Sequence, residues 1–192
     1  FSQSESTRFN YSRGEDTYDP ILSKAVVFPE TNEEVSKILK LCNEHKVPVV
    51  PFGTGTSLEG NVVGNDKGIT ISLEKMNKIL SVNTQDFDCR VQACVTREQL
   101  NDYLREDGVF FPIDPGANAA IGGMASTSAS GTMAVKYGTM KTVITGLTVV
   151  LPNGDIMNTG GRTKKTSAGY NLTNLFVGSE GTLGIITEIQ LR

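Results

Sequence analysis

The stretch Pro51-Phe-Gly-Thr-Gly-Thr-Ser-Leu-Glu-Gly60 follows directly on the apolar run Val47-Pro-Val-Val50. A strand that opens into glycines can bend its backbone until successive N–H groups point at an anion, and the threonine and serine hydroxyls add donors. No Lys or Arg lies between residues 47 and 66, so dipoles rather than side-chain cations would hold a phosphate here. The pattern favours a cofactor pyrophosphate site, with a mobile surface loop as the alternative.

The composition is that of an ordinary globular protein, with 192 residues, 38% hydrophobic and 20% charged. A net charge of −3 argues against a nucleic-acid surface, which needs a clustered basic face. The densest basic run, Arg162-Thr-Lys-Lys165, is short and is expected to be a solvated loop. One histidine and three scattered cysteines form no metal-ligand cluster, and Cys42, Cys89 and Cys94 are expected to be buried free thiols.

Neither a signal peptide nor an apolar stretch of about 18 residues is visible, so no membrane-spanning segment is predicted. The chain begins with Phe rather than Met, and we therefore expect it to be a piece of a longer protein.

Hydrophobic periodicity and capping residues predict the elements. Thr31 with Glu34 and Thr96 with Gln99 are capping boxes, which predict helices over 32–45 and 96–107, the second ending at Gly108. The polar residues 1–12 are expected to be frayed or extended. Strands are predicted at residues 25–28, 47–52, 69–73, 80–83, 90–95, 143–151, 155–159 and 185–191.

The order of these elements predicts an α+β fold of two lobes rather than one doubly wound sheet. Two β-α-β passages, which favour parallel pairing, occupy the first 115 residues. Hairpin-like strands follow from residue 143 and favour a mixed or antiparallel sheet. We expect a small first lobe over about 15–110 and a larger second lobe over about 111–192.

Two common phosphate-binding designs do not fit the first glycine loop. A P-loop needs a lysine where this chain has Asn61, and without it a triphosphate lacks its charge partner. A dinucleotide-binding fold needs a third glycine where Leu58 stands and a helix directly afterwards. Gly60, Gly64 and Gly68 make a helix there improbable, so Glu74 is not expected to bind a ribose.

A third design, two loops closing on one pyrophosphate, has its second loop in residues 114–131. This stretch, Asp114-Pro-Gly-Ala-Asn-Ala-Ala-Ile-Gly-Gly-Met-Ala-Ser-Thr-Ser-Ala-Ser-Gly131, has almost no bulky side chains. Small residues let a backbone approach a flat ligand, and a helix starting at Ile121 could point its N-terminus at the phosphates. Close packing of a helix on a sheet is the alternative.

Six motifs in this order resemble the FAD domain of the vanillyl-alcohol-oxidase-type flavoproteins, the PCMH-type FAD-linked oxidases. They are Pro51–Ser57, Asp114–Ala117, Ile121–Gly123, Ser130–Gly131, Lys136–Gly138 and Gly178–Thr187, and the resemblance runs from about residue 11 to 192. Met124-Ala125, Lys165–Asn171 and Leu175–Gly178 are most similar to the D-lactate dehydrogenase (cytochrome) branch. Many relatives have Asn at the position of Met124 and Asn-Ala-Gly-Gly at residues 128–131.

The resemblance implies that both loops enclose the FAD pyrophosphate, with Gly181–Ile186 on the adenine–ribose side. The implied cofactor-binding residues are Pro51, Phe52, Gly53, Thr54, Gly55, Thr56, Ser57, Gly60, Asn61, Pro115, Gly116, Ala117, Ile121, Gly122, Gly123, Ser126, Thr127, Ser130, Gly131, Tyr137, Gly138, Glu180, Gly181, Gly184, Ile185 and Ile186. The first loop has no His or Cys, so non-covalent FAD is expected.

Oxidation of a 2-hydroxy acid by a flavin needs a base for the hydroxyl proton and a cation for the carboxylate. His45 lies on a helix and is expected to be structural, and Arg162, Lys164 and Lys165 are expected to lie in a solvated loop. We name no catalytic residue and no metal site. The resemblance implies that these groups belong mainly to a C-terminal cap domain, which this chain does not contain.

The resemblance therefore implies the FAD-binding portion of a D-lactate dehydrogenase, which oxidises a D-2-hydroxy acid and passes electrons to a cytochrome or quinone rather than NAD. The alternatives are a glycolate or 2-hydroxyglutarate dehydrogenase, and an isolated FAD-binding module without turnover. An ether-lipid synthase that uses FAD is disfavoured by its motifs around residues 121–131, and a nicotinamide-binding domain is the last rival. The expected location is intracellular, either the bacterial cytoplasm, including its membrane surface, or the mitochondrion.

Overall fold

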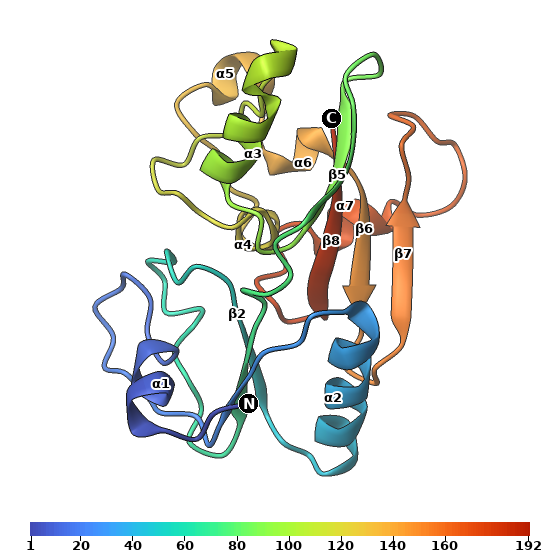
Figure 1. The fold of residues 1–192 in the computed structure, drawn as a ribbon. Helices are drawn as coiled ribbons and strands as arrows, with labels where there is room; N and C mark the ends of the chain where they lie inside the picture. Colours follow the sequence, from blue (N-terminus) through green and yellow to red (C-terminus); the bar gives the residue numbers. More distant parts are fainter.

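The computed structural model describes residues 1–192 and has an α+β fold built on two sheets (Figure 1). The small sheet contains β1 (Val26–Val27), β2 (Val49–Phe52) and β3 (Ile69–Ser72) in the order β1-β3-β2. Both of its pairings are parallel. The predicted β-α-β crossover is present, because α2 (Asn32–Glu44) connects β1 to β2, and β3 later fills the space between these strands.

The large sheet has five strands and is antiparallel throughout. Its order is β4 (Ile79–Asn83), β5 (Asp88–Gln92), β8 (Ile185–Leu191), β6 (Ile144–Val150) and β7 (Ile156–Gly160). The last strand of the chain, β8, therefore lies in the centre, paired with β5 on one side and with β6 on the other. Residues 79–92, predicted to belong to the first lobe, instead contribute two strands to this sheet. Their pairing depends on β8, a partner that local periodicity does not identify.

The two predicted capped helices form where expected. Thr31 Oγ1 accepts the N–H of Glu34 at the start of α2, and Thr96 Oγ1 accepts the N–H of Gln99 at the start of α3 (Arg97–Leu104). A 3-10 turn, η1 (Arg105–Asp107), extends α3 to Gly108, which has φ +69°. No parallel strand follows, so the predicted second β-α-β passage is wrong. After η1, Ala120 forms an isolated antiparallel bridge with Thr96, and the strand that later pairs with β5 is β8, which is antiparallel to it.

The remaining helices are short. They are α4 (Ile121–Ser126), α5 (Ala134–Tyr137), α6 (Met140–Val143) and α7 (Leu172–Phe176). Figure 1 shows α4 near the middle of the molecule, between the strand end of β2 and the large sheet. The small-residue stretch thus does begin a helix at Ile121, as predicted.

The expectation that residues 1–12 are frayed or extended is wrong, because they contain α1 (Glu5–Asn10). Ser4 caps this helix by accepting the N–H of Thr7. Arg8 Nε donates to the carbonyl of Ser23 at 2.6 Å, and Ser2 forms an antiparallel bridge with Val26. The backbone of Ser2 and the side chain of Arg8 therefore attach this segment to the rest of the first lobe, through contacts that periodicity does not reveal.

One hydrophobic core joins the two sheets. It includes Ile71 from the small sheet, Leu147 and Ile189 from the large sheet, and Val35 from α2. Asn32 Nδ2 of α2 also donates to Glu188 of β8 at 2.8 Å. The two lobes consequently pack as one unit. Cys42, Cys89 and Cys94 are buried free thiols, as predicted, and burial raises the pKa of Cys89 to about 12 and of Cys94 to about 11.

Candidate functional site

A pocket of about 300 Å³ lies where three segments meet: the loop after β2, helix α4 with the residues before it, and the segment 178–186. We call it the inter-lobe pocket. Most of the sequence-predicted residues line it: Pro51, Phe52, Gly53, Thr54, Gly55, Thr56, Ser57, Asn61, Pro115, Ala117, Gly122, Gly123, Ser126, Thr127, Glu180, Gly181, Gly184, Ile185 and Ile186. Segments far apart in the sequence therefore converge on one cavity.

The first segment presents a row of backbone donors that have no partner in the protein. None of the N–H groups of residues 53–58 donates a hydrogen bond to another protein group. Residues 53–58 are half-buried or exposed, so their N–H groups are free to donate to a bound anion, and a row of such donors beside a cavity fits an anion site. Gly55 is required for the turn, because its φ is +73° and a Cβ there would lie 2.8 Å from Cζ of Phe52.

Thr54 connects this loop to the second segment. Its Oγ1 accepts the N–H of Ala120 at 3.1 Å, at the residue that precedes α4. A Cβ at Gly53 would lie 3.3 Å from the Cβ of Ala120, so the two backbones approach each other closely here. The two loops predicted from sequence thus contact each other directly at one side of the pocket.

The adjacent glycines of α4 have different surroundings. The N–H of Gly122 donates to the carbonyl of Ala93 at 2.7 Å, and a Cβ at Gly122 would lie 2.7 Å from the Cβ of Ala93. A Cβ at Gly123 would meet no protein atom within 4 Å, although Gly123 lines the pocket. Gly122 therefore serves the packing of α4, and Gly123 leaves room beside the cavity.

The third segment closes the pocket through Glu180 and Gly181. The N–H of Glu180 donates to the carbonyl of Ser126 at 2.9 Å, which joins this segment to the end of α4. Glu180 has φ +52°, an uncommon conformation for a residue with a side chain. A Cβ at Gly181 would lie 3.3 Å from Cγ of Pro51, so this segment also packs on the first loop.

The charged side chains of the lining are both acidic, Glu15 and Glu180, and no Lys, Arg, His or Cys belongs to it. Asn61 Nδ2 donates to Glu180 Oε2 at 2.8 Å, and Ser57 donates to Asn61 Oδ1. With no side-chain cation in the lining, an anion in this pocket would be held by backbone N–H groups and hydroxyls.

Tyr11 packs against Phe52, at the start of the first segment. Its ring makes edge contacts with Phe52 at 5.0 Å and with Phe28 at 5.5 Å between centroids. The hydroxyl of Tyr11 donates to Glu74, and burial followed by this contact raises the pKa of Tyr11 to about 12. Glu74 thus accepts a hydrogen bond from a tyrosine and does not line the inter-lobe pocket. Sequence reasoning missed Tyr11, because its aromatic contacts are non-local.

Seven predicted residues do not line the pocket: Gly60, Gly116, Ile121, Ser130, Gly131, Tyr137 and Gly138. Ile121 is fully buried in the core. A Cβ at Gly131 would lie 2.0 Å from the carbonyl oxygen of Asp114, which indicates a packing role. Tyr137 makes an edge contact with Phe110 at 5.6 Å and lines a separate groove of about 220 Å³.

The lining also contains residues that sequence reasoning did not select. They are Glu15, Leu58, Val62, Leu73, Ala93, Ala119, Ala120, Met124 and Ala129. Several of these are neighbours of selected residues, so a continuous reading of residues 51–62 and 115–129 would have included them. Glu15, Leu73 and Ala93 reach the pocket from other parts of the fold, and the sequence carries no local signal for them.

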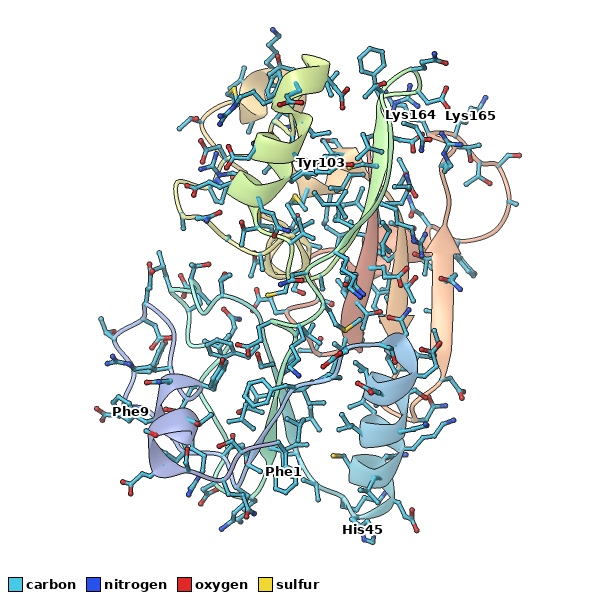
Figure 2. The ribbon with its side chains drawn as sticks, in the orientation of Figure 1. Phe1, Phe9, His45, Tyr103, Lys164 and Lys165 are labelled. Carbon is cyan, nitrogen blue, oxygen red and sulfur yellow. The ribbon has the colours of Figure 1, made fainter.

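The basic and histidine side chains lie elsewhere. Figure 2 shows His45 at the far end of α2 and Lys164 and Lys165 beyond the large sheet. Arg162 donates to both carboxylate oxygens of Asp88, at 2.7 to 3.1 Å, and to Asp86 at 2.7 Å. The Arg162 guanidinium lowers the pKa of Asp88. Arg162, Lys164 and Lys165 are all exposed in the loop that follows β7, as predicted, and Arg162 in addition holds Asp86 and Asp88.

Two further kinds of feature are absent from the structure. No group of three His, Cys, Asp or Glu side chains is placed to hold a metal ion. None of the helices is long and apolar enough to cross a bilayer.

Comparison with known proteins gives a consistent family assignment. The family described as FAD binding domain matches residues 23–160. The chain is 50% identical over 194 residues to a probable mitochondrial D-lactate dehydrogenase of Danio rerio, covering 100% of this chain and 39% of that protein. It is 52% identical over 167 residues to the mitochondrial D-lactate dehydrogenase [cytochrome] of Arabidopsis thaliana, covering 87% of this chain and 30% of that protein.

More distant similarities extend beyond the lactate enzymes. The glycolate oxidase subunit GlcD of Bacillus subtilis is 40% identical over 190 residues, with 98% of this chain and 40% of that protein covered. An alkyldihydroxyacetonephosphate synthase structure superposes with a TM-score of 0.86 at 25% identity, covering 99% of this chain and 37% of that chain. The chain thus spans well under half the length of these relatives.

Proposed function

Because this chain belongs to the family of FAD-binding domains of the FAD-linked oxidases, we propose that the inter-lobe pocket holds the pyrophosphate of its cofactor, FAD. The observation that carries the proposal is the row of unpaired N–H groups at residues 53–58, which lies beside a pocket without side-chain cations. We propose residues 1–192 as one FAD-binding domain whose two lobes share a core.

The residues of the pocket fit a flat, doubly charged ligand. We propose that the N–H groups of the first loop and the hydroxyl of Thr56 donate hydrogen bonds to the phosphate oxygens. Gly123 and Gly181 let the backbone approach the ligand, and Ile185 and Ile186 supply apolar surface for an aromatic ring. The absence of His and Cys from the lining supports non-covalent attachment.

When bound, FAD supplies an acceptor for a hydride from the carbon that carries a substrate hydroxyl. The chain would contribute binding, orientation and the exclusion of water from the pyrophosphate. The pocket lining offers no Lys, Arg or His as a base or as a partner for a substrate carboxylate. We therefore assign no catalytic residue here.

We propose that the full-length protein is an FAD-dependent oxidoreductase that oxidises D-lactate or a related D-2-hydroxy acid. The identities of 50% and 52% to D-lactate dehydrogenases support this substrate class, and the names of those relatives support a mitochondrial location. The cytochrome named for the Arabidopsis relative supports a cytochrome as electron acceptor. We propose that a cap domain following this chain supplies the catalytic groups, since the relatives are much longer.

Two alternatives have specific support. The 40% identity to a glycolate oxidase subunit favours a smaller 2-hydroxy acid as the substrate. The absence of Lys, Arg and His from the pocket lining favours a binding module that has no turnover by itself. A single series of measurements separates them: substrate oxidation by the full-length protein, with D-lactate, L-lactate, glycolate and D-2-hydroxyglutarate compared at equal concentration.

The cofactor proposal is tested with the 192-residue chain. The chain is purified or reconstituted with FAD, dialysed, and precipitated with acid, and the supernatant is examined for flavin absorbance. We expect about one FAD per chain, released without covalent residue in the pellet. A folded chain that binds neither added FAD nor its adenosine diphosphate portion would contradict the proposal.

A further inference from the structure

We propose that Asn61 and Glu180 are positioning residues whose hydrogen bond forms a clasp across the rim of the inter-lobe pocket and slows the release of FAD. This inference rests on the proposed function and extends it to two particular side chains. The clasp consists of Ser57, Asn61 and Glu180, which are linked in a row by side-chain hydrogen bonds.

The clasp joins two walls of the pocket that are distant in the sequence. Asn61 and Glu180 are 119 residues apart, yet their side chains meet at 2.8 Å. Asn61 belongs to the loop that follows β2, and Glu180 belongs to the segment that precedes β8. All three clasp residues line the pocket, so the bond connects these two walls at the surface of the molecule.

Glu180 is also attached to the remaining wall. Its N–H donates to the carbonyl of Ser126 at the end of α4, at 2.9 Å. Two residues earlier, the N–H of Gly178 donates to the carbonyl of Ala125, also at 2.9 Å. Glu180 therefore contacts α4 through its backbone and the first loop through its side chain, and it connects all three walls.

The backbone of Glu180 has an unusual conformation that fits a role at a ligand site. Its φ of +52° lies in the left-handed region, which is uncommon for a residue other than Gly, Asn or Asp. Such conformations cost free energy and persist where surrounding contacts hold them, often at ligand sites. In Glu180 this conformation accompanies a side chain that accepts the bond from Asn61.

Each side chain of the clasp has a defined role as hydrogen-bond donor or acceptor. Asn61 accepts from Ser57 through Oδ1 and donates to Glu180 through Nδ2, so its amide is used at both ends. An aspartate at position 61 could still accept from Ser57, but it would place a carboxylate against Glu180. A glutamine at position 180 could accept from an asparagine at position 61 or donate to an aspartate there, because an amide carries both functions.

These donor and acceptor roles allow a test in which a second substitution, at Glu180, restores what a first substitution, at Asn61, has lost. We expect Asn61→Asp to accelerate FAD release about tenfold, because it replaces a charge-assisted hydrogen bond by repulsion. We expect Glu180→Gln to release FAD within about twofold of the wild-type rate, and the double variant to return to within about twofold of it. The measurement is the rate at which flavin fluorescence recovers when FAD-loaded chain is diluted.

The double variant also distinguishes the clasp from a simple charge effect on the pyrophosphate. If the two substitutions acted independently on the charge near FAD, their separate effects on the release rate would multiply. The clasp requires the opposite, a coupling in which Glu180→Gln has little effect alone but a large effect in the Asn61→Asp background. A release rate of the double variant equal to the product of the two single effects would overturn the proposal. So would an Asn61→Asp variant that releases FAD less than about twofold faster than the wild type.

Two controls separate the clasp from loss of folding. Asn65→Asp adds the same charge in the same loop, at a residue outside the pocket lining, and should leave the release rate unchanged. The unfolding midpoint of the FAD-free chain is measured for every variant. An equal loss of stability in Asn61→Asp and in the double variant, with no recovery of FAD retention, would overturn the clasp. A wild-type chain that binds no FAD would overturn the proposed function as well.

Discussion

The ring of Phe52 occupies the space that a side chain at Gly55 would need: a Cβ at Gly55 would lie 2.8 Å from Cζ of Phe52. Phe52 is itself buried and is held by the edge of the Tyr11 ring at 5.0 Å. The turn that directs the N–H groups of residues 53–58 therefore depends on a glycine beside a fixed aromatic ring. The first loop is therefore sensitive to the addition of a Cβ atom at position 55.

Gly55→Val should abolish FAD binding. Valine is strained at φ +73° and collides with Phe52, so we also expect the free energy of unfolding to fall by about 1–3 kcal/mol. Flavin absorbance of the purified chain and equilibrium unfolding in urea measure the two effects. His45→Ala, at the exposed end of α2, is the control and should keep both FAD and stability. Loss of FAD in His45→Ala would contradict the structural role given to that histidine.

Gly122→Ala and Gly123→Ala should have opposite effects on the stability of the FAD-free chain, although the two residues are adjacent. At Gly122 the new methyl group would lie 2.7 Å from the Cβ of Ala93, and overpacking of this kind costs about 1–3 kcal/mol. At Gly123 it would meet no protein atom, and alanine is favoured over glycine in a helix by roughly 0.5–1 kcal/mol.

The two alanine variants are compared for unfolding without FAD and for FAD affinity by titration. We expect Gly122→Ala to be less stable without FAD. We expect Gly123→Ala to be as stable as the wild type or more so, but to bind FAD at least about tenfold more weakly, because the methyl group narrows the space left for the ligand. Unchanged FAD affinity in Gly123→Ala would indicate that this glycine does not face the cofactor.

The ion pair of Arg162 with Asp88 should make stability depend on pH in the acid range. Its hydrogen bonds lower the pKa of Asp88 below the ordinary value of 3.8. A lowered native pKa contributes stability that is present above the unfolded value and is lost as the pH falls through the native value. Arg162→Ala should therefore destabilise the chain more at pH 7 than at about pH 3, as urea unfolding at several pH values would show.

Arg105→Ala is a suitable comparison for Arg162→Ala. Arg105 also pairs with an aspartate, Asp102, but their side chains are 77% and 66% exposed, whereas Asp88 is 5% exposed. Exposed pairs contribute little, so Arg105→Ala should change stability only slightly at any pH. A pH-independent effect of Arg162→Ala would mean that this arginine acts by packing alone.

Tyr11 should produce a loss of stability at alkaline pH. Burial and the contact with Glu74 raise the pKa of Tyr11 from 10.0 to about 12. A raised native pKa means that the unfolded chain ionises first, so stability present below pH 10 is lost progressively as the pH rises toward 12. Phenolate absorbance and unfolding followed together would show one late-titrating tyrosine.

Tyr11→Phe keeps the ring contacts with Phe28 and Phe52 and removes the ionisable hydroxyl. It should lose the Glu74 hydrogen bond at neutral pH and flatten the alkaline loss of stability. Tyr103→Phe, at a residue that is 58% exposed, should preserve the alkaline profile of the wild type. Identical alkaline profiles in Tyr11→Phe and the wild type would contradict the assignment.

Local sequence determined the parts of this protein whose causes are local. The hydroxyl caps at Thr31 and Thr96, the αL glycine at residue 108 and the apolar, β-branched residues of 185–191 act locally, and these elements form as predicted. The glycine loop after β2 and the small-residue stretch before α4 require residues that allow tight turns and close backbone approach, and the residue types alone indicate this. They allowed two loops and a family resemblance to be inferred.

Only the tertiary structure decided which of those segments meet. β8 enters the sheet between β5 and β6, and that insertion carries Glu180 and Gly181 to the first loop. Periodicity gives the burial of each face of a strand but not its partner, because pairing over long separations depends on closing the whole core at once. The two loops can thus be identified from the local sequence. The pocket that they form, and the hydrogen bond from Asn61 to Glu180 at its rim, result from the packing of both lobes.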